Sequence, residues 1–133
     1  EREVVEVVQE ADAVGEPLLV LGGGSNLVVA DDGFDGTVLR VATRGIERSD
    51  EGLDIAAGED WDEAVALLVS EGYAGVEALS GIPGLVGAAP IQNIGAYGQD
   101  LSQTLRRVRA LDRRTGDDGG ARDDGGFGQG GST

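Results

Sequence analysis

The stretch that most constrains how this chain can fold runs from Gly81 to Gly98 and reads GIPGLVGAAPIQNIGAYG. It holds five glycines and two prolines in eighteen residues and no charged side chain, although 26% of the whole chain is charged. Glycine lets the backbone approach a partner closely or adopt positive φ, whereas proline fixes φ and removes a donor. The stretch therefore predicts a stiff wall of backbone N–H groups and small side chains. Such a wall suits a flat or anionic ligand, and it equally suits a tightly turned core segment without a ligand.

A second glycine cluster, Gly22-Gly23-Gly24-Ser25-Asn26, lies about sixty residues upstream. Apolar runs at 18–21 and 27–30 flank it, so the pattern predicts a strand, a turn and a second strand. A dinucleotide-binding fingerprint needs a third glycine, where this chain has Leu27, and it needs a helix directly after the turn. The N–H groups of a glycine turn can instead form an anion-binding nest, with a hairpin turn without ligand as the alternative.

Composition narrows the chemistry that the chain can perform. It has no Cys, His or Met, and all ten basic residues are Arg. Disulfides, thiolate or imidazole metal sites, Ser–His or Cys–His catalysis and a Schiff-base lysine are therefore excluded, and redox chemistry requires a bound cofactor. The net charge of −15 argues against nucleic acid and anionic membranes as partners. A phosphate would have to be held by local N–H dipoles.

The 133 residues are enough for one domain or for two small lobes that share a core. Apolar periodicity predicts a helix over 1–14 and another over 60–71, the second opened by Asp60 as N-cap and by Glu63 in a capping box. Segment 44–52 is expected to be a polar connection. The expected strands are 18–21, 27–30, 37–41, 53–57 and an exposed edge strand at 105–112. Nothing resembles a signal peptide or a membrane span, so a cytoplasmic protein is the default expectation.

Longer strings around both glycine clusters resemble a known family. The strings LGGGSNLVVADDGFDGTVLRV, AGEDWDEAV and LSGIPGLVGAAPIQNIGAYGQDL are similar to the UDP-N-acetylenolpyruvoylglucosamine reductase (UDP-N-acetylmuramate dehydrogenase) family, over about residues 1–116. The resemblance implies an α+β fold, a truncated FAD-binding domain of the vanillyl-alcohol-oxidase or PCMH type with FAD between two α/β lobes. We expect partial lobes at 1–46 and 47–115, a flexible Gly/Asp-rich tail at 116–133, and no substrate domain in this chain.

The resemblance also implies which residues contact FAD. The first glycine cluster would contact the pyrophosphate and ribityl region through Gly22, Gly23, Gly24, Ser25 and Asn26. A second phosphate-side loop would comprise Gly81, Ile82, Pro83, Gly84, Gly87, Ala88 and Ala89. The chain would continue along the cofactor towards the flavin with Gln92, Asn93, Gly95, Ala96, Tyr97 and Gly98. Tyr97 has an equally plain alternative as a structural aromatic whose hydroxyl binds a backbone partner.

Family chemistry implies that NADPH reduces FAD and that the reduced flavin passes hydride to the enolpyruvyl double bond of a UDP-sugar, in peptidoglycan precursor synthesis. The serine acid and the glutamate that complete this reduction lie in the substrate domain, so no catalytic residue and no metal site is assigned here. Where the family carries GFGYR, this chain has GFGQG at 126–130. We therefore expect flavin binding without turnover, and the oligomeric state stays open. Another PCMH-type oxidoreductase and a non-catalytic acidic α/β interaction domain remain the alternatives.

Overall fold

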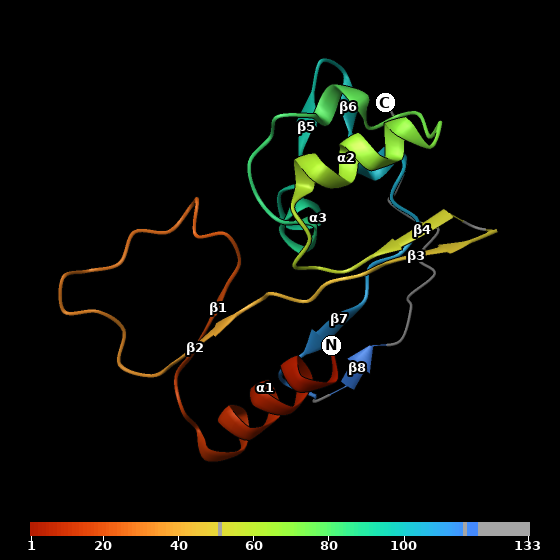
Figure 1. The fold of residues 1–133 in the computed structure, drawn as a ribbon. Coiled ribbons are helices and arrows are strands. Elements are labelled where there is room, and N and C mark those ends of the chain that lie inside the picture. Colours follow the sequence, from red (N-terminus) through yellow and green to blue (C-terminus); the bar gives the residue numbers. More distant parts are fainter. Residues whose placement is uncertain (51, 116, 120–133) are drawn as a thin grey trace, which may run out of the picture.

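A computed structural model describes residues 1–50, 52–115 and 117–119, which form a mixed arrangement of helices and short strands (Figure 1). The amphipathic N-terminal sequence folds as helix α1 (Arg2–Val14), as predicted, and buries Val8 and Ala11. Gly15 ends the helix in the left-handed region at φ 69°, where glycine carries no steric cost. None of the described helices is long and apolar enough to cross a membrane.

Strands β1 (Leu18–Leu21) and β2 (Thr37–Arg40) pair in parallel and in register from Leu18 opposite Thr37. A long loop over residues 22–36 connects them and reaches away from both strands (Figure 1). The expected strand at 27–30 is wrong, because these residues form no strand and Val28 is 97% exposed. An apolar run becomes a strand only when a partner strand supplies the hydrogen bonds, and no described strand lies against this one.

Strands β3 (Ile46–Ser49) and β4 (Gly52–Ile55) form an antiparallel hairpin. The sequence predicts a polar connection at 44–52, and that expectation is wrong because pairing with β4 organises most of it. One face of this hairpin is open to solvent, so the charged side chains of β3 are tolerated there. Arg48 of β3 binds the Glu71 carboxylate at the end of the following helix, which ties the hairpin to that helix.

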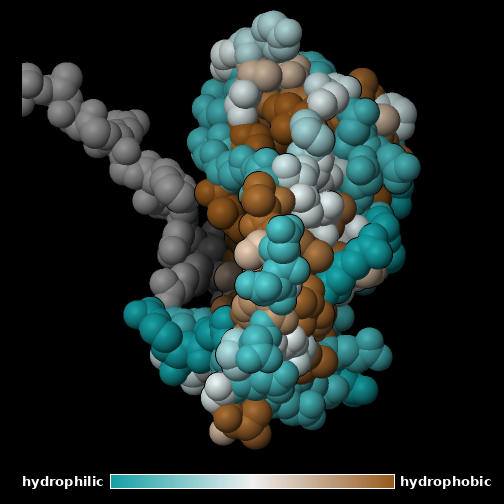
Figure 2. Space-filling model, turned by 90° about the vertical axis from the view of Figure 1, so that its left-hand side faces the viewer, coloured by the Kyte–Doolittle hydropathy of each residue, from teal (hydrophilic) through white to brown (hydrophobic). Residues whose placement is uncertain are grey.

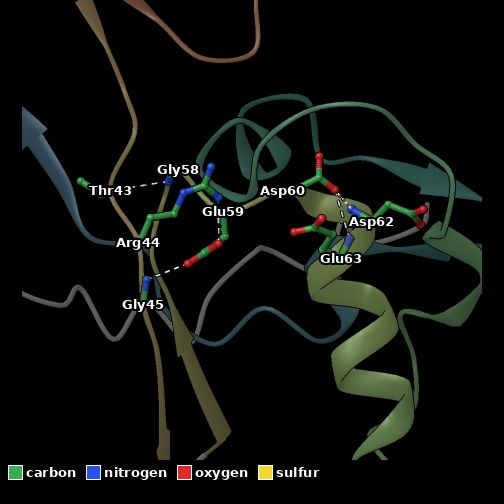
Figure 3. Close-up of polar contacts among 8 residues, drawn as sticks. All are labelled: Thr43, Arg44, Gly45, Gly58, Glu59, Asp60, Asp62 and Glu63. Atoms are coloured by element: carbon green, nitrogen blue, oxygen red, sulfur yellow. Dashed lines mark hydrogen bonds and ion pairs between the residues drawn. The ribbon is translucent and has the colours of Figure 1, made fainter.

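Helix α2 (Trp61–Ser70) begins at the predicted N-cap, Asp60. The return hydrogen bond from the Asp60 N–H to the Glu63 side chain, which completes a capping box, is not found among the described residues. The Asp60 carboxylate accepts hydrogen bonds from the backbone N–H groups of Asp62 at 2.9 Å and Glu63 at 3.1 Å (Figure 3). The main core packs against this helix and includes Trp61, whose indole N–H donates to the Leu79 carbonyl at 2.9 Å. The other buried members of this core are Val65, Val76, Leu79, Ala89 and Leu101.

The glycine-rich stretch that follows folds into short pieces around that core. A 3₁₀ turn (Val86–Ala88) leads into α3 (Ala89–Gln92), and a small hairpin joins β5 (Gly95–Ala96) to β6 (Gln99–Asp100). Two further 3₁₀ turns, Glu77–Leu79 and Leu101–Gln103, flank these pieces. Proline and glycine at these spacings prevent any long helix or strand, which explains the short elements.

The chain then returns to α1. Strand β7 (Ala110–Asp112) pairs antiparallel with β8 (Asp117–Gly119) and lies beside α1 in Figure 1. The edge strand expected at 105–112 is therefore correct only for its last three residues. At Asp117–Gly119 the structure has a strand where a flexible tail is expected, and the rest of that tail lies outside the described residues. Ion pairs of Arg113 with Asp12 and of Arg109 with Glu1 fasten the returning segment to α1.

Two groups of elements result, separated along the length of the molecule in Figure 1. We call α1, β1, β2 and β7 the α1 unit, and α2, α3, β5 and β6 the α2 unit. The chain crosses between them at 41–45 and again at 105–109. At the first crossing Gly58 is buried against Thr43, and a Cβ on Gly58 would lie 2.5 Å from the Thr43 nitrogen.

We predict that Gly58→Ala lowers the free energy of unfolding by about 1–3 kcal/mol, the usual cost of forcing an atom into a filled site. Urea unfolding followed by the fluorescence of Trp61 measures this change. Gly23→Ala is the matched control, because a Cβ there meets nothing within 4 Å. Equal stability of the two variants would contradict the close packing at this crossing.

Candidate functional site

A cleft of about 200 Å³ lies between the two glycine clusters. Its walls come from the end of β1 and the following turn on one side, and from the α2 unit on the other. Among the residues that the structure describes, none that lines the cleft carries a formal charge, in a chain whose net charge is −15. The lining residues are Val20, Leu21, Gly22, Gly23, Gly24, Ser25, Asn26, Leu27, Trp61, Ile82, Pro83, Gly84, Leu85, Ala88, Ala89, Gln92 and Ile94.

The structure brings most of the predicted cofactor residues into this one cleft. All five residues of the first cluster line it, together with Ile82, Pro83, Gly84, Ala88, Ala89 and Gln92. The predicted residues that do not line it are Gly81, Gly87, Asn93, Gly95, Ala96, Tyr97 and Gly98. Segments about sixty residues apart in sequence thus meet at one place. Two structural turns that share no ligand would have no need to lie together.

The first cluster offers unpaired backbone donors. Within the part of the chain that the structure describes, the N–H groups of residues 22–26 donate no hydrogen bond to another residue. Gly24 adopts the left-handed region at φ 76°, which only glycine reaches without strain. Successive N–H groups in such a turn form a concave site for an anion and need no lysine or arginine.

Backbone hydrogen bonds to residues 57–61 hold the second cluster in place. All three hydrogen bonds are between backbone groups. The Gly84 carbonyl accepts from the backbone N–H of Trp61 at 3.0 Å. The Val86 N–H donates to the Glu59 carbonyl, and the Gly87 N–H donates to the Ala57 carbonyl, both at 2.9 Å. A Cβ on Gly87 would lie 2.6 Å from that of Ala57. Gly87 is therefore needed for close backbone packing, a role that differs from the ligand contact predicted for it.

Asp62, in the first turn of α2, fixes the start of the second cluster. One carboxylate oxygen accepts from the Ser80 hydroxyl and from the Gly81 N–H, each at 2.7 Å. These two hydrogen bonds, the Ser80 hydroxyl foremost, stabilise the charged form and lower the pKa of Asp62 below its ordinary value. The sequence pattern gives Asp62 no role, because nothing in its spacing shows that it faces a loop 18 residues later.

A direct contact joins the clusters across the cleft. The Asn26 side-chain amide donates to the Gln92 carboxamide oxygen at 3.5 Å, a long and therefore weak hydrogen bond. Both side chains can switch to a ligand, since each carboxamide carries a donor and an acceptor. Figure 2 shows brown apolar surface interspersed with teal hydrophilic surface over one face of the molecule, and several large apolar side chains are exposed.

The remaining predicted residues form the hairpin beyond the cleft. Asn93 ends α3 at φ 43°, and its side-chain oxygen accepts from the Ser102 N–H at 3.0 Å. Tyr97 sits at φ 52° and is 97% exposed, and its hydroxyl has no hydrogen-bond partner among the described residues. The alternative of a structural aromatic with a backbone partner is therefore wrong. A fully exposed aromatic at positive φ is costly and is typical of a functional position.

Sequence reasoning missed part of the cleft wall. Trp61 is not among the predicted cofactor residues, and the structure places it both in the core and along the cleft. Leu85, Ile94 and Val20 complete the apolar wall. An apolar side chain in a core and one beside a ligand follow the same sequence pattern, so only the fold distinguishes them.

Comparison with known proteins decides the family. A family model described as FAD binding domain matches residues 1–117. The chain belongs to the FAD binding domain family. The UDP-N-acetylenolpyruvoylglucosamine reductase of Streptomyces coelicolor is 58% identical over 115 residues, which cover 86% of this chain and 30% of that protein. The reductase of the same name from Saccharopolyspora erythraea is 58% identical over 118 residues, 85% of this chain and 32% of its own length.

The predicted resemblance and the predicted FAD cofactor are thereby confirmed at the level of the domain. The match also confirms that this chain corresponds to the FAD-binding part of these reductases, since it spans about 30% of the length of the relatives it matches. The individual FAD contacts are not tested by the comparisons and remain predictions.

We predict that Asp62→Asn lowers the free energy of unfolding at pH 7 but changes it little in strong acid. The pKa of Asp62 is lowered in the folded chain, so its contribution is full above the unfolded value of about 3.9 and is lost as the pH falls through the folded-state pKa. Urea unfolding at a series of pH values measures the change. Asp32→Asn, in the exposed loop after the first glycine cluster, is the control. A difference between Asp62→Asn and wild type that persists in strong acid would contradict the assignment.

Proposed function

We propose that this chain binds FAD across the cleft between its two glycine clusters. The observation that carries the proposal is a cleft in a strongly acidic chain whose described lining residues are all uncharged. They include glycine-turn N–H groups that have no partner within the described part of the chain. A dinucleotide pyrophosphate is repelled by carboxylates and is attracted by oriented N–H dipoles. The donor set therefore fits the pyrophosphate of FAD.

In this proposal the α1 unit and the α2 unit are the two lobes of a PCMH-type domain, with FAD between them. We propose the division between the lobes at about residue 46, with β7 assigned to the first lobe because Leu111 of β7 lines a small pocket with Val8 of α1. The cleft of about 200 Å³ is smaller than the roughly 300–1,000 Å³ of typical ligand sites, so it accommodates part of FAD. The rest extends over the exposed hairpin at 95–98, where Tyr97 is available for stacking.

The whole-protein reaction is likewise proposed from resemblance. The relatives carry the name UDP-N-acetylenolpyruvoylglucosamine reductase, and this chain spans about 30% of their length. We propose that it serves an NADPH-dependent reduction of a UDP-sugar enolpyruvate in peptidoglycan precursor synthesis in the cytoplasm. This chain supplies FAD binding, and no residue in it is assigned to catalysis. We expect no turnover by residues 1–133 alone.

Trp61 provides a direct test, because it is the single tryptophan of the chain and lines the cleft. We predict saturable quenching of its fluorescence when FAD is added. Gly23→Asp should weaken the affinity at least about tenfold, because a carboxylate about 4 Å from a phosphate opposes binding by several kcal/mol at the effective dielectric of a protein surface.

Gly23→Asn is the matched control, because the Asn side chain has nearly the same shape as that of Asp and carries no charge. A Cβ at position 23 meets nothing within 4 Å. Gly23→Asn should bind FAD more tightly than Gly23→Asp, because the Asp and Asn side chains share their steric cost and differ in charge. Absence of FAD binding by a folded wild-type chain, or equal affinities of the Asp and Asn variants, would contradict the proposal.

A further inference from the structure

Residues 57–61 lie between the two parts of the chain that form the cleft. On one side this segment bonds the second glycine cluster through Ala57, Glu59 and Trp61, as described above. On its other side it bonds the first crossing between the units, since the Gly58 N–H donates to the Thr43 hydroxyl at 3.1 Å (Figure 3). The segment thus contacts the second glycine cluster directly. It reaches the first cluster only through the crossing segment, whose Val41 N–H donates to the Leu21 carbonyl at the end of β1 at 2.8 Å.

The Glu59 side chain makes the strongest of these contacts. One carboxylate oxygen accepts from the Gly45 N–H at 2.7 Å and the other binds the Arg44 guanidinium at 2.9 Å (Figure 3). The Glu59 side chain is only 19% exposed. The Gly45 N–H foremost, and then Arg44, lower the pKa of Glu59, so the carboxylate stays charged at neutral pH. Charge-assisted hydrogen bonds of this kind are about twice as strong as neutral ones.

The backbone around Glu59 is closely packed. A Cβ on Gly58 would lie 2.5 Å from the Thr43 nitrogen, and a Cβ on Gly87 would lie 2.6 Å from that of Ala57. Three stretches of backbone, at 43–45, 57–59 and 84–87, are therefore packed at the closest possible spacing. A shift of the crossing segment would have to break the bonds of Glu59 before it could open this packing.

We propose that Glu59 is a positioning residue that sets the distance between the two glycine clusters and hence the affinity for FAD. The inference rests on the proposed function. Glu59 is not among the residues that line the cleft, so it acts through its neighbours. On one side its carboxylate binds the crossing segment, which is bonded to the end of β1. On the other side its backbone carbonyl accepts from the Val86 N–H in the second cluster. Its carboxylate binds the crossing segment at two points, the backbone N–H of Gly45 and the guanidinium of Arg44. Two contacts fix both the distance and the orientation of the crossing segment relative to residues 57–61.

Distance measurement between the units tests this directly. The chain has no cysteine, so Glu10→Cys on α1 and Ala66→Cys on α2, both exposed, accept spin labels at two defined sites. Double electron–electron resonance should give a narrow distance distribution for this labelled chain. Adding Glu59→Ala should broaden or shift the distribution, and Glu59→Gln should do so less, because an amide accepts one of the two hydrogen bonds.

The same variants without labels are titrated with FAD by Trp61 fluorescence. We expect Glu59→Ala to weaken FAD binding at least about tenfold, with Glu59→Gln intermediate. Glu63→Gln is the matched control, because the Glu63 carboxylate has no hydrogen-bond partner among the described residues and Glu63 lies four residues further along the chain, in the first turn of α2 (Figure 3). It should change neither the distance nor the affinity. Far-UV circular dichroism checks folding, and Glu59→Gln carries the test if Glu59→Ala does not fold.

An unchanged distance distribution in a folded Glu59 variant would overturn the inference, even if the affinity fell. A broadened distribution with wild-type affinity would overturn it as well. Absence of FAD binding by the wild-type chain would instead overturn the proposed function, and the distance measurement would still show whether Glu59 holds the units.

Discussion

The backbone hydrogen bonds of residues 57–61, together with the close packing around them, are the constraint on which the rest of the structure depends. It places α2, the second glycine cluster and the crossing to the α1 unit against one another at spacings that exclude a Cβ on Gly58 and on Gly87. Without it, the two glycine clusters would be independent turns on separate groups of elements. With it, they face each other across a cleft.

Electrostatics explains why that cleft is built from backbone. With no lysine or histidine and a net charge of −15, the chain pairs arginines such as Arg44, Arg48 and Arg113 with its own carboxylates. None of these arginines lines the cleft, and no carboxylate from residues 1–50, 52–115 or 117–119 does either. An anionic ligand is then attracted only by local N–H dipoles, which work at short range and are little affected by the long-range field.

Local signals predicted part of this architecture. The cap at Asp60 and the apolar periodicity after it predicted the start of α2, and α1 ends at Val14, the last residue of the predicted helix. The strand expected at 27–30 failed because strand formation depends on a partner that local sequence cannot show. The contacts of Glu59 and Asp62 were equally invisible, since each joins segments 14 or more residues apart. The glycine clusters were recognised by composition, and only the fold shows that they share one cleft.

Hydrogen–deuterium exchange of the full chain with and without FAD tests the central claim most directly. The N–H groups of residues 22–26 have no partner among the described residues, so they should exchange rapidly in the free chain. FAD should slow exchange in this cluster and, at the same FAD concentration, around residues 82–89. Protection of one cluster without the other, or of neither, would contradict a single cofactor held across the cleft.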